Sequence, residues 1–202
     1  MKKFAKITLD IISLIATLIV LIVFGFYLYL NQKIDMSINK ELYDYLVEEI
    51  NASKDLPDRF YEMYGQVTGF TEKSTTNKYL FKGLMNLKSP HFKNPCPCID
   101  ATYDLHINYR ATIDKWNLGV ALDKDASPKK CLDYYLSKFY FLYNTFGIQN
   151  ASRFYYQKDL EQLTDDEMLE LAIMTLNPSF YNKIRNPERL QRMVEEIKKK
   201  HL

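Results

Sequence analysis

The sequence predicts a mainly α-helical protein, in which one helical domain follows a single N-terminal transmembrane helix. Residues 11–30 carry no charged side chain and consist mostly of Ile, Leu, Val and Phe. From Ser127 onward, apolar residues recur at helical spacing behind side chains that commonly cap helices. The roughly 170 residues after the apolar segment suffice for one domain with a substantial core, and not for two large ones.

The apolar segment 11–30 has the length of a membrane-spanning helix. At about 1.5 Å per residue it extends roughly 30 Å, the thickness of a bilayer's hydrocarbon core. Lys2, Lys3 and Lys6 precede it, and the positive-inside tendency then keeps the amino terminus in the cytosol. The alternative is a cleaved signal peptide, whose apolar part is shorter and ends in small residues. Because the segment ends in the aromatic-rich stretch 24–30, an uncleaved anchor is favoured.

The distribution of charge argues against a nucleic-acid partner. The first 30 residues contain three Lys and one Asp, so they account for the whole formal net charge of +2. Residues 31–202 are therefore close to neutral and offer no polybasic surface to a phosphate backbone. We expect no nucleic acid among the partners.

Between the anchor and residue 126, the helix signals are uneven. We expect a helix over 37–51, joined to the anchor by a polar hinge at 31–35, with this apolar stripe: Leu42, Tyr45, Leu46 and Ile50. Prolines interrupt the short apolar pieces of 52–100. Residues 103–110 alternate strictly between apolar and polar, which by itself predicts a strand.

Three helices are predicted with clear starts in the C-terminal part. Ser127 supplies an N-cap before Pro128 at the first helical position. Thr164 and Glu167 form a capping box ahead of a second helix. Pro187 opens a last helix, whose expected inward residues are Leu190, Met193, Val194 and Ile197.

The three cysteines leave two possibilities open. Cys96 and Cys98 are too close for an unstrained bridge to each other, so a disulfide would join one of them to Cys131. A zinc site would need a fourth ligand, for which His91 and His106 are the nearby histidines. The sequence favours buried thiols or one disulfide over a metal site.

Residues 147–187 carry a series of ordered motifs. The stretch begins G-I-Q-N-A-S-R-F-Y-Y-Q-K-D at Gly147, continues with an L-T-x-x-E element ending at Glu167, and then carries Asn177-Pro178 and Asn186-Pro187. It resembles the carboxy-terminal part of glycosyltransferase family 51, the peptidoglycan transglycosylases that polymerise lipid-linked disaccharides. That family reads approximately Y-G-I-x-x-A-A-x-x-Y-F-G-K, L-[ST]-x-x-E, A-P-x-x-Y and N-P.

The resemblance runs in one register from Lys129 to Arg192 and includes residues 131–136 (C-L-D-Y-Y-L), which follow the family's I-L-E-x-Y-L. It implies an α-rich, lysozyme-like domain over 53–202, behind a cytosolic tail and anchor (1–30) and an extracytoplasmic helical stalk (31–52). For residues 103–110 the resemblance implies helix, in conflict with their alternation.

The family's first catalytic motif, E-D-x-x-F-x-x-H-x-G, matches poorly. Aligning on Phe60 and Gly65 places Leu56 at the catalytic glutamate and Met63 at the histidine. Leucine cannot accept a proton, and a positioned general base contributes about 10²–10⁴-fold to rate. The neighbouring carboxylates of Asp58 and Glu62 are candidates to replace this base. In the alternative interpretation they are solvated charges near the end of a helix.

The family's other two motifs survive as remnants. Residues 74–79 (S-T-T-N-K-Y) align with G-G-S-T-I-T-Q-Q, without its double glycine and glutamines. The basic–acidic helix R-K-x-K-E is barely recognisable at 113–116; its glutamate falls on Lys115, and the family's second glutamate falls on Asp123. Asp123 is therefore a third catalytic candidate, although an aspartate in this context is more often a surface residue. The resemblance nominates these substrate-binding residues: Ser74, Thr75, Lys78 and Lys115.

Two functions follow from the resemblance. The first is a monofunctional, outward-facing bacterial transferase that polymerises lipid II, with an inverting mechanism and a relocated base. The second is a non-catalytic relative, a pseudoenzyme that binds lipid-linked precursor, glycan strand or a cell-wall synthesis protein at the membrane. We expect no cofactor, although members of the family can use a divalent cation. The missing base favours the second function.

Overall fold

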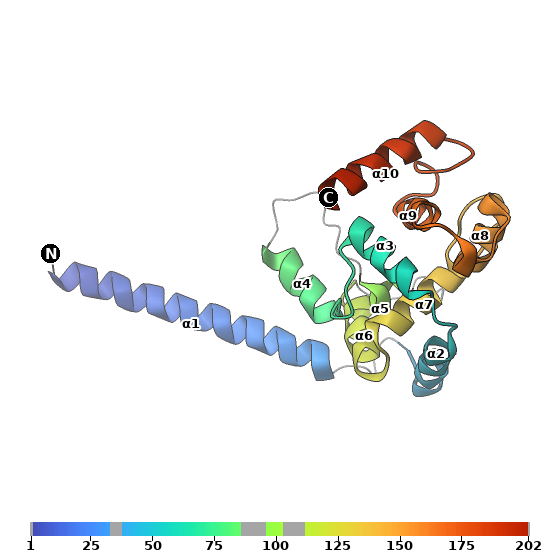
Figure 1. Cartoon of the computed structure of the whole chain (residues 1–202). Coiled ribbons are helices and arrows are strands. Elements are labelled where there is room, and N and C mark those ends of the chain that lie inside the picture. The colour runs from blue at the N-terminus through green and yellow to red at the C-terminus, as the bar shows by residue number, and fades with distance from the viewer. Residues whose placement is uncertain (1, 33–37, 86–95, 103–111, 202) are drawn as a thin grey trace.

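The computed structural model describes residues 2–32, 38–85, 96–102 and 112–201. Within these ranges the chain consists of α-helices, one short 3-10 helix and a single isolated antiparallel bridge between Tyr140 and Phe146, without a β-strand (Figure 1). The predicted mainly α fold class is therefore confirmed. The alternating residues 103–110 lie outside the described part of the chain.

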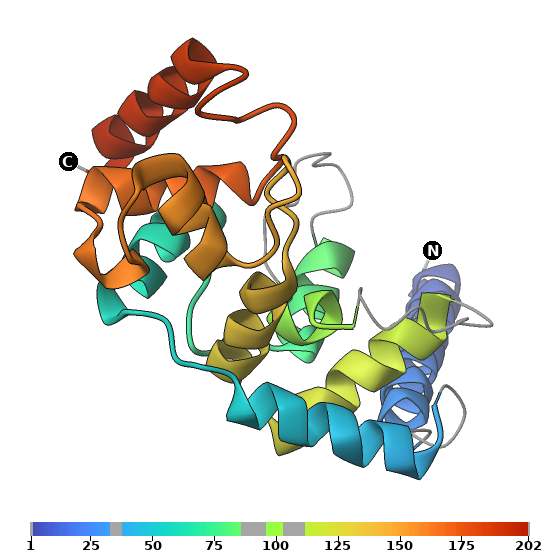
Figure 2. The same ribbon diagram turned by 90° about the vertical axis from the view of Figure 1, so that its right-hand side faces the viewer.

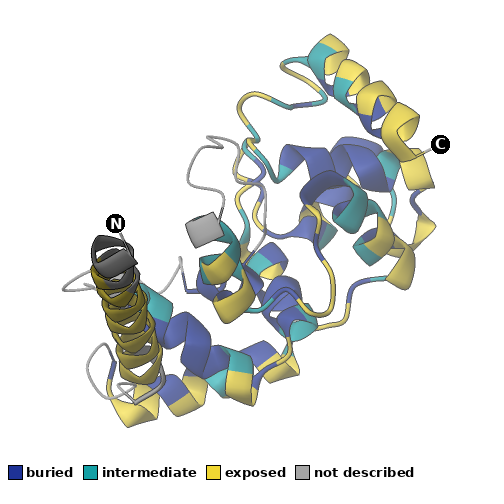
Figure 3. Cartoon of the chain, turned by 90° about the vertical axis from the view of Figure 1, so that its left-hand side faces the viewer, coloured by how far each residue is buried: buried dark blue, intermediate teal, exposed yellow. Residues whose placement is uncertain are grey.

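The first helix, α1 (Lys2–Gln32), extends away from the helical body in Figure 1. Its stretch Asp10–Tyr29 has a mean hydropathy of 2.8, and none of it is buried against the rest of the protein. Figure 3 colours the described residues along this helix as exposed. In length and composition α1 can cross a membrane, which is consistent with the predicted anchor.

The next helix, α2 (Lys40–Ala52), confirms the helix expected over 37–51 but not all of its inward stripe. Asn39 caps it, because the Asn39 Oδ1 accepts a hydrogen bond from the Leu42 N–H at 2.8 Å. The residues it buries are Tyr43, Leu46 and Ile50. Leu42 and Tyr45 are exposed instead. The helix packs its 43/46/50 stripe against α7 and so turns those two apolar residues outward.

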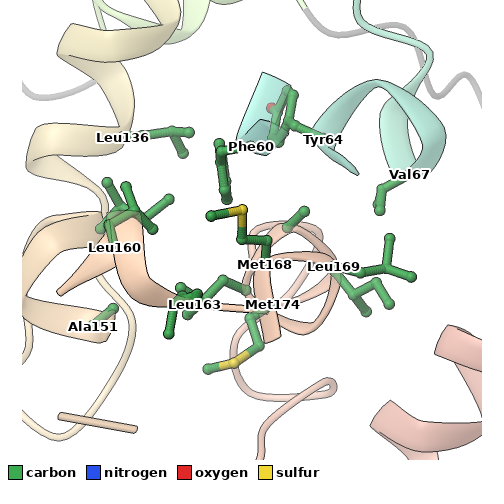
Figure 4. Packing of buried hydrophobic residues seen from close by; sticks show 14 of the residues in the cluster. Phe60, Tyr64, Val67, Leu136, Ala151, Leu160, Leu163, Met168, Leu169 and Met174 are labelled. Carbon is green, nitrogen blue, oxygen red and sulfur yellow. The ribbon is translucent and has the colours of Figure 1, made fainter. Parts of the chain in front are cut away.

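Two hydrophobic cores organise the body. The large core is built by α3 (Asp58–Thr68), α8 (Ile148–Tyr156), α9 (Asp165–Met174) and α10 (Pro187–His201), together with one face of α7 (Pro128–Lys138). A 3-10 helix, η2 (Leu160–Gln162), connects α8 to α9. Figure 4 shows Phe60 of α3 and Met168 of α9 facing each other inside this core.

The small core is built by α2, α5 (Pro97–Asp100), α6 (Thr112–Asp125) and the other face of α7. A disulfide between Cys98 and Cys131 fastens α5 to α7. The sequence left buried thiols or one disulfide open; the bond that forms joins Cys131 to one member of the 96/98 pair, as expected for any disulfide here, and Cys96 is a free, buried thiol. The remaining helix, α4 (Thr76–Met85), lies against α6.

Helix α7 belongs to both cores, and Figure 2 shows it near the middle of the body. Leu132 and Leu136, four residues apart, face the large core. Cys131 and Tyr134, three residues apart, face the small core. One short helix therefore fixes the position of each core relative to the other.

The predicted starts of the C-terminal helices are confirmed. The Ser127 Oγ accepts from the Lys130 N–H at 3.1 Å at the start of α7. At the start of α9, the Thr164 Oγ1 accepts from the Glu167 N–H, and a Glu167 carboxylate oxygen accepts from the Thr164 N–H. This reciprocal pair is the predicted capping box. In α10 the expected residues turn inward, with Met193 only partly buried.

Buried polar contacts tie the C-terminal segments together. Glu170 of α9 is almost fully buried and accepts hydrogen bonds from the Tyr156 hydroxyl, the Lys183 ammonium and the Gln191 amide at 2.5–2.9 Å. Because the carboxylate has three donors from three segments, its burial is compensated. Asn182, which is fully buried, donates in the same region to the Tyr155 hydroxyl at 2.9 Å.

Candidate functional site

Three of the four predicted substrate-binding residues meet at one small cavity. Ser74, Thr75 and Lys78 line it, together with Lys82 one turn further along α4. Its volume is about 50 Å³. The wall combines the hydroxyl-bearing side chains of Thr71, Ser74, Thr75 and Tyr79 with the two lysines, and hydroxyl and ammonium groups are the chemistry that binds phosphate oxygens.

The loop that builds this cavity follows from local backbone rules. Gly69 ends α3 in the left-handed conformation, with φ of 77°, and its N–H donates to the Gly65 carbonyl. A turn follows, in which the Ser74 Oγ accepts from the Thr71 N–H at 2.9 Å. The serine side chain therefore shapes the loop as well as lining the cavity, and α4 begins two residues later.

Asp123 reaches the start of α4 from helix α6. Its Oδ2 accepts from the Thr76 N–H at 2.6 Å, so this carboxylate caps α4. The two helices approach closely because Gly119 has no side chain: a Cβ there would lie 2.9 Å from the Thr76 Oγ1 and 2.5 Å from an Ile99 side-chain carbon. Asp123 therefore contacts Thr76, which follows the cavity-lining Ser74 by two positions in the chain.

The carboxylate of Asp123 is only partly solvated. Its Oδ1 is buried without a hydrogen-bond partner, and burial raises its pKa to about 6 despite the stabilising Thr76 N–H. The expectation of a surface residue is therefore wrong. A carboxylate with this pKa is able to exchange a proton near neutral pH.

Lys115, the fourth predicted substrate-binding residue, does not line the cavity. It lies on α6, where its charge acts on Asp100 of α5. Burial raises the pKa of Asp100 to about 6, and the attraction of Lys115 offsets only part of that shift.

The region aligned with the first catalytic motif contains no inward carboxylate at the predicted positions. Leu56 is only 6% exposed and belongs to the large core. Asp58 is exposed and forms an ion pair with Lys129 at 3.1 Å. Glu62 is also exposed, on the outer face of α3. Neither lines the cavity at Ser74.

One buried carboxylate was missed as a site candidate. Asp133 of α7 is 1% exposed, and its Oδ1 accepts from the Tyr61 hydroxyl and from the Leu56 N–H. Its Oδ2 is buried without a partner. Burial raises its pKa to about 6. The sequence signal was present, because position 133 aligns with the glutamate of the I-L-E-x-Y-L motif.

The described residues contain no group of three or more His, Cys, Asp or Glu side chains placed to hold a metal ion. His91 and His106, the possible zinc ligands, lie outside the described ranges. Burial raises the pKa of the Cys96 thiol to about 12, so the metal-free thiol stays protonated at neutral pH.

Comparisons with known proteins find partial matches to penicillin-binding proteins. Penicillin-binding protein 1F of Bacillus subtilis (strain 168) is 36% identical over 72 residues, which cover 36% of this chain and 10% of that protein. Penicillin-binding protein 1A of Streptococcus oralis is 34% identical over 82 residues, covering 41% of this chain and 13% of that protein. The chain therefore matches about a tenth of the length of these relatives.

The match to a protein family covers more of the chain. The model of the family described as "Transglycosylase" matches residues 101–201, half of the 202 residues. The matched half contains helices α6 to α10, and with them Asp123, Asp133 and the buried polar contacts around Glu170. On this match, and on the helical architecture that accompanies it, the chain belongs to the transglycosylase family.

Proposed function

We propose that this chain is a membrane-anchored transglycosylase-family protein of bacterial cell-wall biogenesis that binds a lipid-linked glycan precursor without polymerising it. In this proposal residues 1–30 form the cytosolic tail and anchor, residues 31–52 the extracytoplasmic link and residues 53–202 the domain. Helix α2 would connect the two while packed against α7. The observation that carries the proposal is the burial of Leu56 at the position of the family's catalytic glutamate.

Glycosyl transfer to an acceptor hydroxyl needs a base that removes its proton. At position 56 the side chain is aliphatic and packed in the large core, and only its backbone N–H makes polar contacts. The flanking carboxylate of Asp58 is exposed and faces Lys129. Both observations support the loss of the family's reaction in this chain.

The cavity at Ser74 supports retained binding. Ammonium groups of Lys78 and Lys82 and hydroxyl groups of Ser74 and Thr75 offer donors to the oxygens of a pyrophosphate. An anchored domain would meet a lipid-linked substrate in the plane of the membrane, where two-dimensional confinement raises its effective concentration. Binding therefore needs only modest intrinsic affinity.

The test uses the full chain in detergent with fluorescent lipid II. We expect saturable binding and no glycan polymer. Lys78→Ala should weaken binding roughly tenfold, as loss of a charge-assisted hydrogen bond does. Lys73→Ala, at a lysine on the loop before α4 that does not line the cavity, should leave binding unchanged. Polymer formation, or the absence of any binding, contradicts the proposal.

A second candidate is a transferase with a relocated base, and one observation favours it. Asp123 is partly buried, carries an unpartnered Oδ1 and has a pKa of about 6, which suits a general base near neutral pH. If polymer forms and Asp123→Asn abolishes it, this candidate replaces the first. Polymerisation lost in Asp58→Asn or Glu62→Gln instead would assign the base to one of those exposed carboxylates.

A further inference from the structure

A cavity of about 330 Å³ lies where α10 begins, and no residue of its lining is shared with the cavity at Ser74. Three arginines line it, Arg185, Arg189 and Arg192, beside one acidic residue, Glu188. Three positive charges against one negative charge leave a net charge of +2 on the lining. The sequence contains six arginines, so half of them surround this one cavity.

These arginines differ from the others in having no carboxylate partner. Within the described part of the chain, the side chains of Arg185 and Arg192 form neither an ion pair nor a hydrogen bond. The Arg189 guanidinium lies 3.8 Å from the centre of the Phe180 ring, in a cation–π contact that holds it in place. The other arginines that the structure describes both pair with aspartates, at 2.5 and 2.7 Å. The cavity therefore presents guanidinium groups whose planar donors are available to carboxylates of another molecule.

The loop that carries Arg185 is held in shape by two asparagine side chains. Asn182 is fully buried, and its Oδ1 accepts from the N–H groups of Ile184 and Arg185, both at 3.0 Å. The Asn186 amide donates to two carbonyls of the same loop at 3.1 and 3.2 Å. A surface that is already ordered loses little conformational entropy when it binds.

Apolar side chains border the charged cavity. Phe180 is 43% exposed and Ile184 is 57% exposed. Arginine and aromatic residues are enriched at protein–protein interfaces and lysine is depleted there; no lysine is among the described residues that line this cavity. The combination suits an acidic protein surface with apolar residues better than a free phosphate ion. We call the three arginines together with Phe180 and Ile184 the arginine face.

The same chain presents a surface of the opposite kind on α2. Leu42 and Tyr45, which the fold turns outward, are 37% and 57% exposed. Three glutamates flank them: Glu41, Glu48 and Glu49. At 3.6 residues per turn, these five residues fall within about a third of the circumference of the helix. Among the described residues none of the three glutamates has an ion-pair partner. We call these five residues the acidic face.

The two faces are complementary, since each combines exposed apolar side chains with unpaired charges of one sign. In Figures 1 and 2, α2 and the start of α10 lie at opposite ends of the helical body. One chain therefore does not bring its own two faces together. A contact between them joins two copies.

We propose that the acidic face on α2 binds the arginine face of a second copy of this chain. The glutamates pair with the guanidinium groups around the cavity, while Leu42 and Tyr45 pack against Phe180 and Ile184. Because the two faces differ, the contact is heterologous, and a pair of copies keeps one free face of each kind. Association then continues into a ring or a row of copies. This contact goes beyond the precursor binding proposed above and does not depend on it.

Sedimentation velocity of the full chain in detergent tests the contact. The mass of the wild type should rise with protein concentration and fall as sodium chloride screens the charges. The double variant Arg185→Ala, Arg192→Ala should associate about tenfold or more weakly, as loss of interface arginines does. Lys199→Ala with Lys200→Ala is the matched control, because it removes the same charge from exposed positions at the other end of α10 and should leave association unchanged.

A second double variant tests the other face. Tyr45→Ala with Glu48→Ala should weaken self-association to a similar extent, and both side chains are exposed, so the fold is retained. Each double variant keeps the face that the other lacks. An equimolar mixture of the two should therefore form a dimer that does not grow further, which distinguishes a heterologous contact from a symmetric one.

A wild type that stays monomeric at concentrations up to about 100 μM overturns the proposal. An equal loss of association in the lysine control, or a mixture of the two double variants that gains no dimer, overturns it as well. Both double variants should bind lipid II as the wild type does. Failure of this contact and failure of precursor binding therefore give different patterns.

Discussion

The large and small cores of this protein differ in how closely they match the transglycosylase family and in which candidate site residues lie near them. The large core, from α7 to α10 with α3, is built mostly from the half of the chain that matches the transglycosylase family, and its buried carboxylate Glu170 has three hydrogen-bond donors. The region around the small core and α4 holds the partly buried carboxylate of Asp123 and a cavity lined by hydroxyl and ammonium groups, while Leu56, at the position that we align with the family's catalytic glutamate, is packed in the large core. Packing and chemistry depend on different residues, so one can be lost while the other remains.

The largest effect should come from the polar centre of the large core. Glu170→Ala leaves the donors of Tyr156, Lys183 and Gln191 without their shared acceptor, and breaking a buried charged group of this kind costs about 3–5 kcal/mol. Urea denaturation should show this loss in the free energy of unfolding. Glu161→Gln, an exposed ion-pair partner, is the control and should change stability by less than about 1 kcal/mol. Similar losses of stability in both variants would show that the buried contacts of Glu170 contribute no more to the large core than an exposed ion pair does.

The next effect concerns the small core. Replacing both Cys98 and Cys131 by Ala opens a link that spans 33 residues, which should cost about 3–4 kcal/mol in the chain-entropy view. Thermal unfolding with and without reductant measures it: the wild type should lose stability on reduction, and the double variant should not respond. A double variant as stable as the oxidised wild type would mean that packing alone positions α5.

A smaller effect is the pH dependence contributed by Asp133, on the helix shared by both cores. Burial raises its pKa to about 6, above the roughly 3.9 of an unfolded chain. Between these values the folded state holds a proton that the unfolded state has released, so stability falls as pH rises from about 4 to 6. The fall is on the order of 2–3 kcal/mol.

Asp133→Asn should therefore lose less stability than the wild type across this pH window, and should be the more stable protein at pH 7. Asp58→Asn, at an exposed position, is the control and should keep the wild-type slope. Denaturation at pH 4, 5, 6 and 7 gives both slopes. Identical slopes for the wild type and Asp133→Asn would show that this carboxylate is better solvated than its burial implies.

The smallest effect should come from the surface contacts between α3 and α9. Arg59 pairs with Asp165 at 2.5 Å, but both side chains are more than half exposed. A double-mutant cycle with Arg59→Ala and Asp165→Ala should give a coupling energy of about 1 kcal/mol or less. A larger coupling would assign the α3–α9 contact to charge rather than to the Phe60–Met168 packing.

The sequence allowed the local features of the fold to be predicted well. The caps at Ser127 and Thr164 depend on residues three positions apart, so they can be recognised without tertiary information. The inward face of α10 follows from periodicity in the same way. In α2 the periodicity was ambiguous, and packing against α7 selected Tyr43 over Leu42 and Tyr45.

The candidate site was only partly predictable, because its geometry depends on contacts distant in sequence. Ser74, Thr75 and Lys78 are close in the chain, and they do meet at one cavity. The inward position of Asp123 depends on the close approach of α6 to α4 at Gly119, which no local pattern reveals. The unsatisfied oxygen of Asp133 likewise becomes visible only when the surrounding side chains are placed.

The bond between α5 and α7 also links this fold to a cellular compartment. Disulfides persist in oxidising surroundings and are reduced in the cytosol. In a reducing compartment the chain would carry two thiols, at Cys98 and Cys131, and would lose the covalent link between α5 and α7. The reduced chain should be more easily cut by proteases than the disulfide-bonded form. In the extracytoplasmic placement proposed above, crossing the membrane would therefore complete the maturation of this half of the molecule.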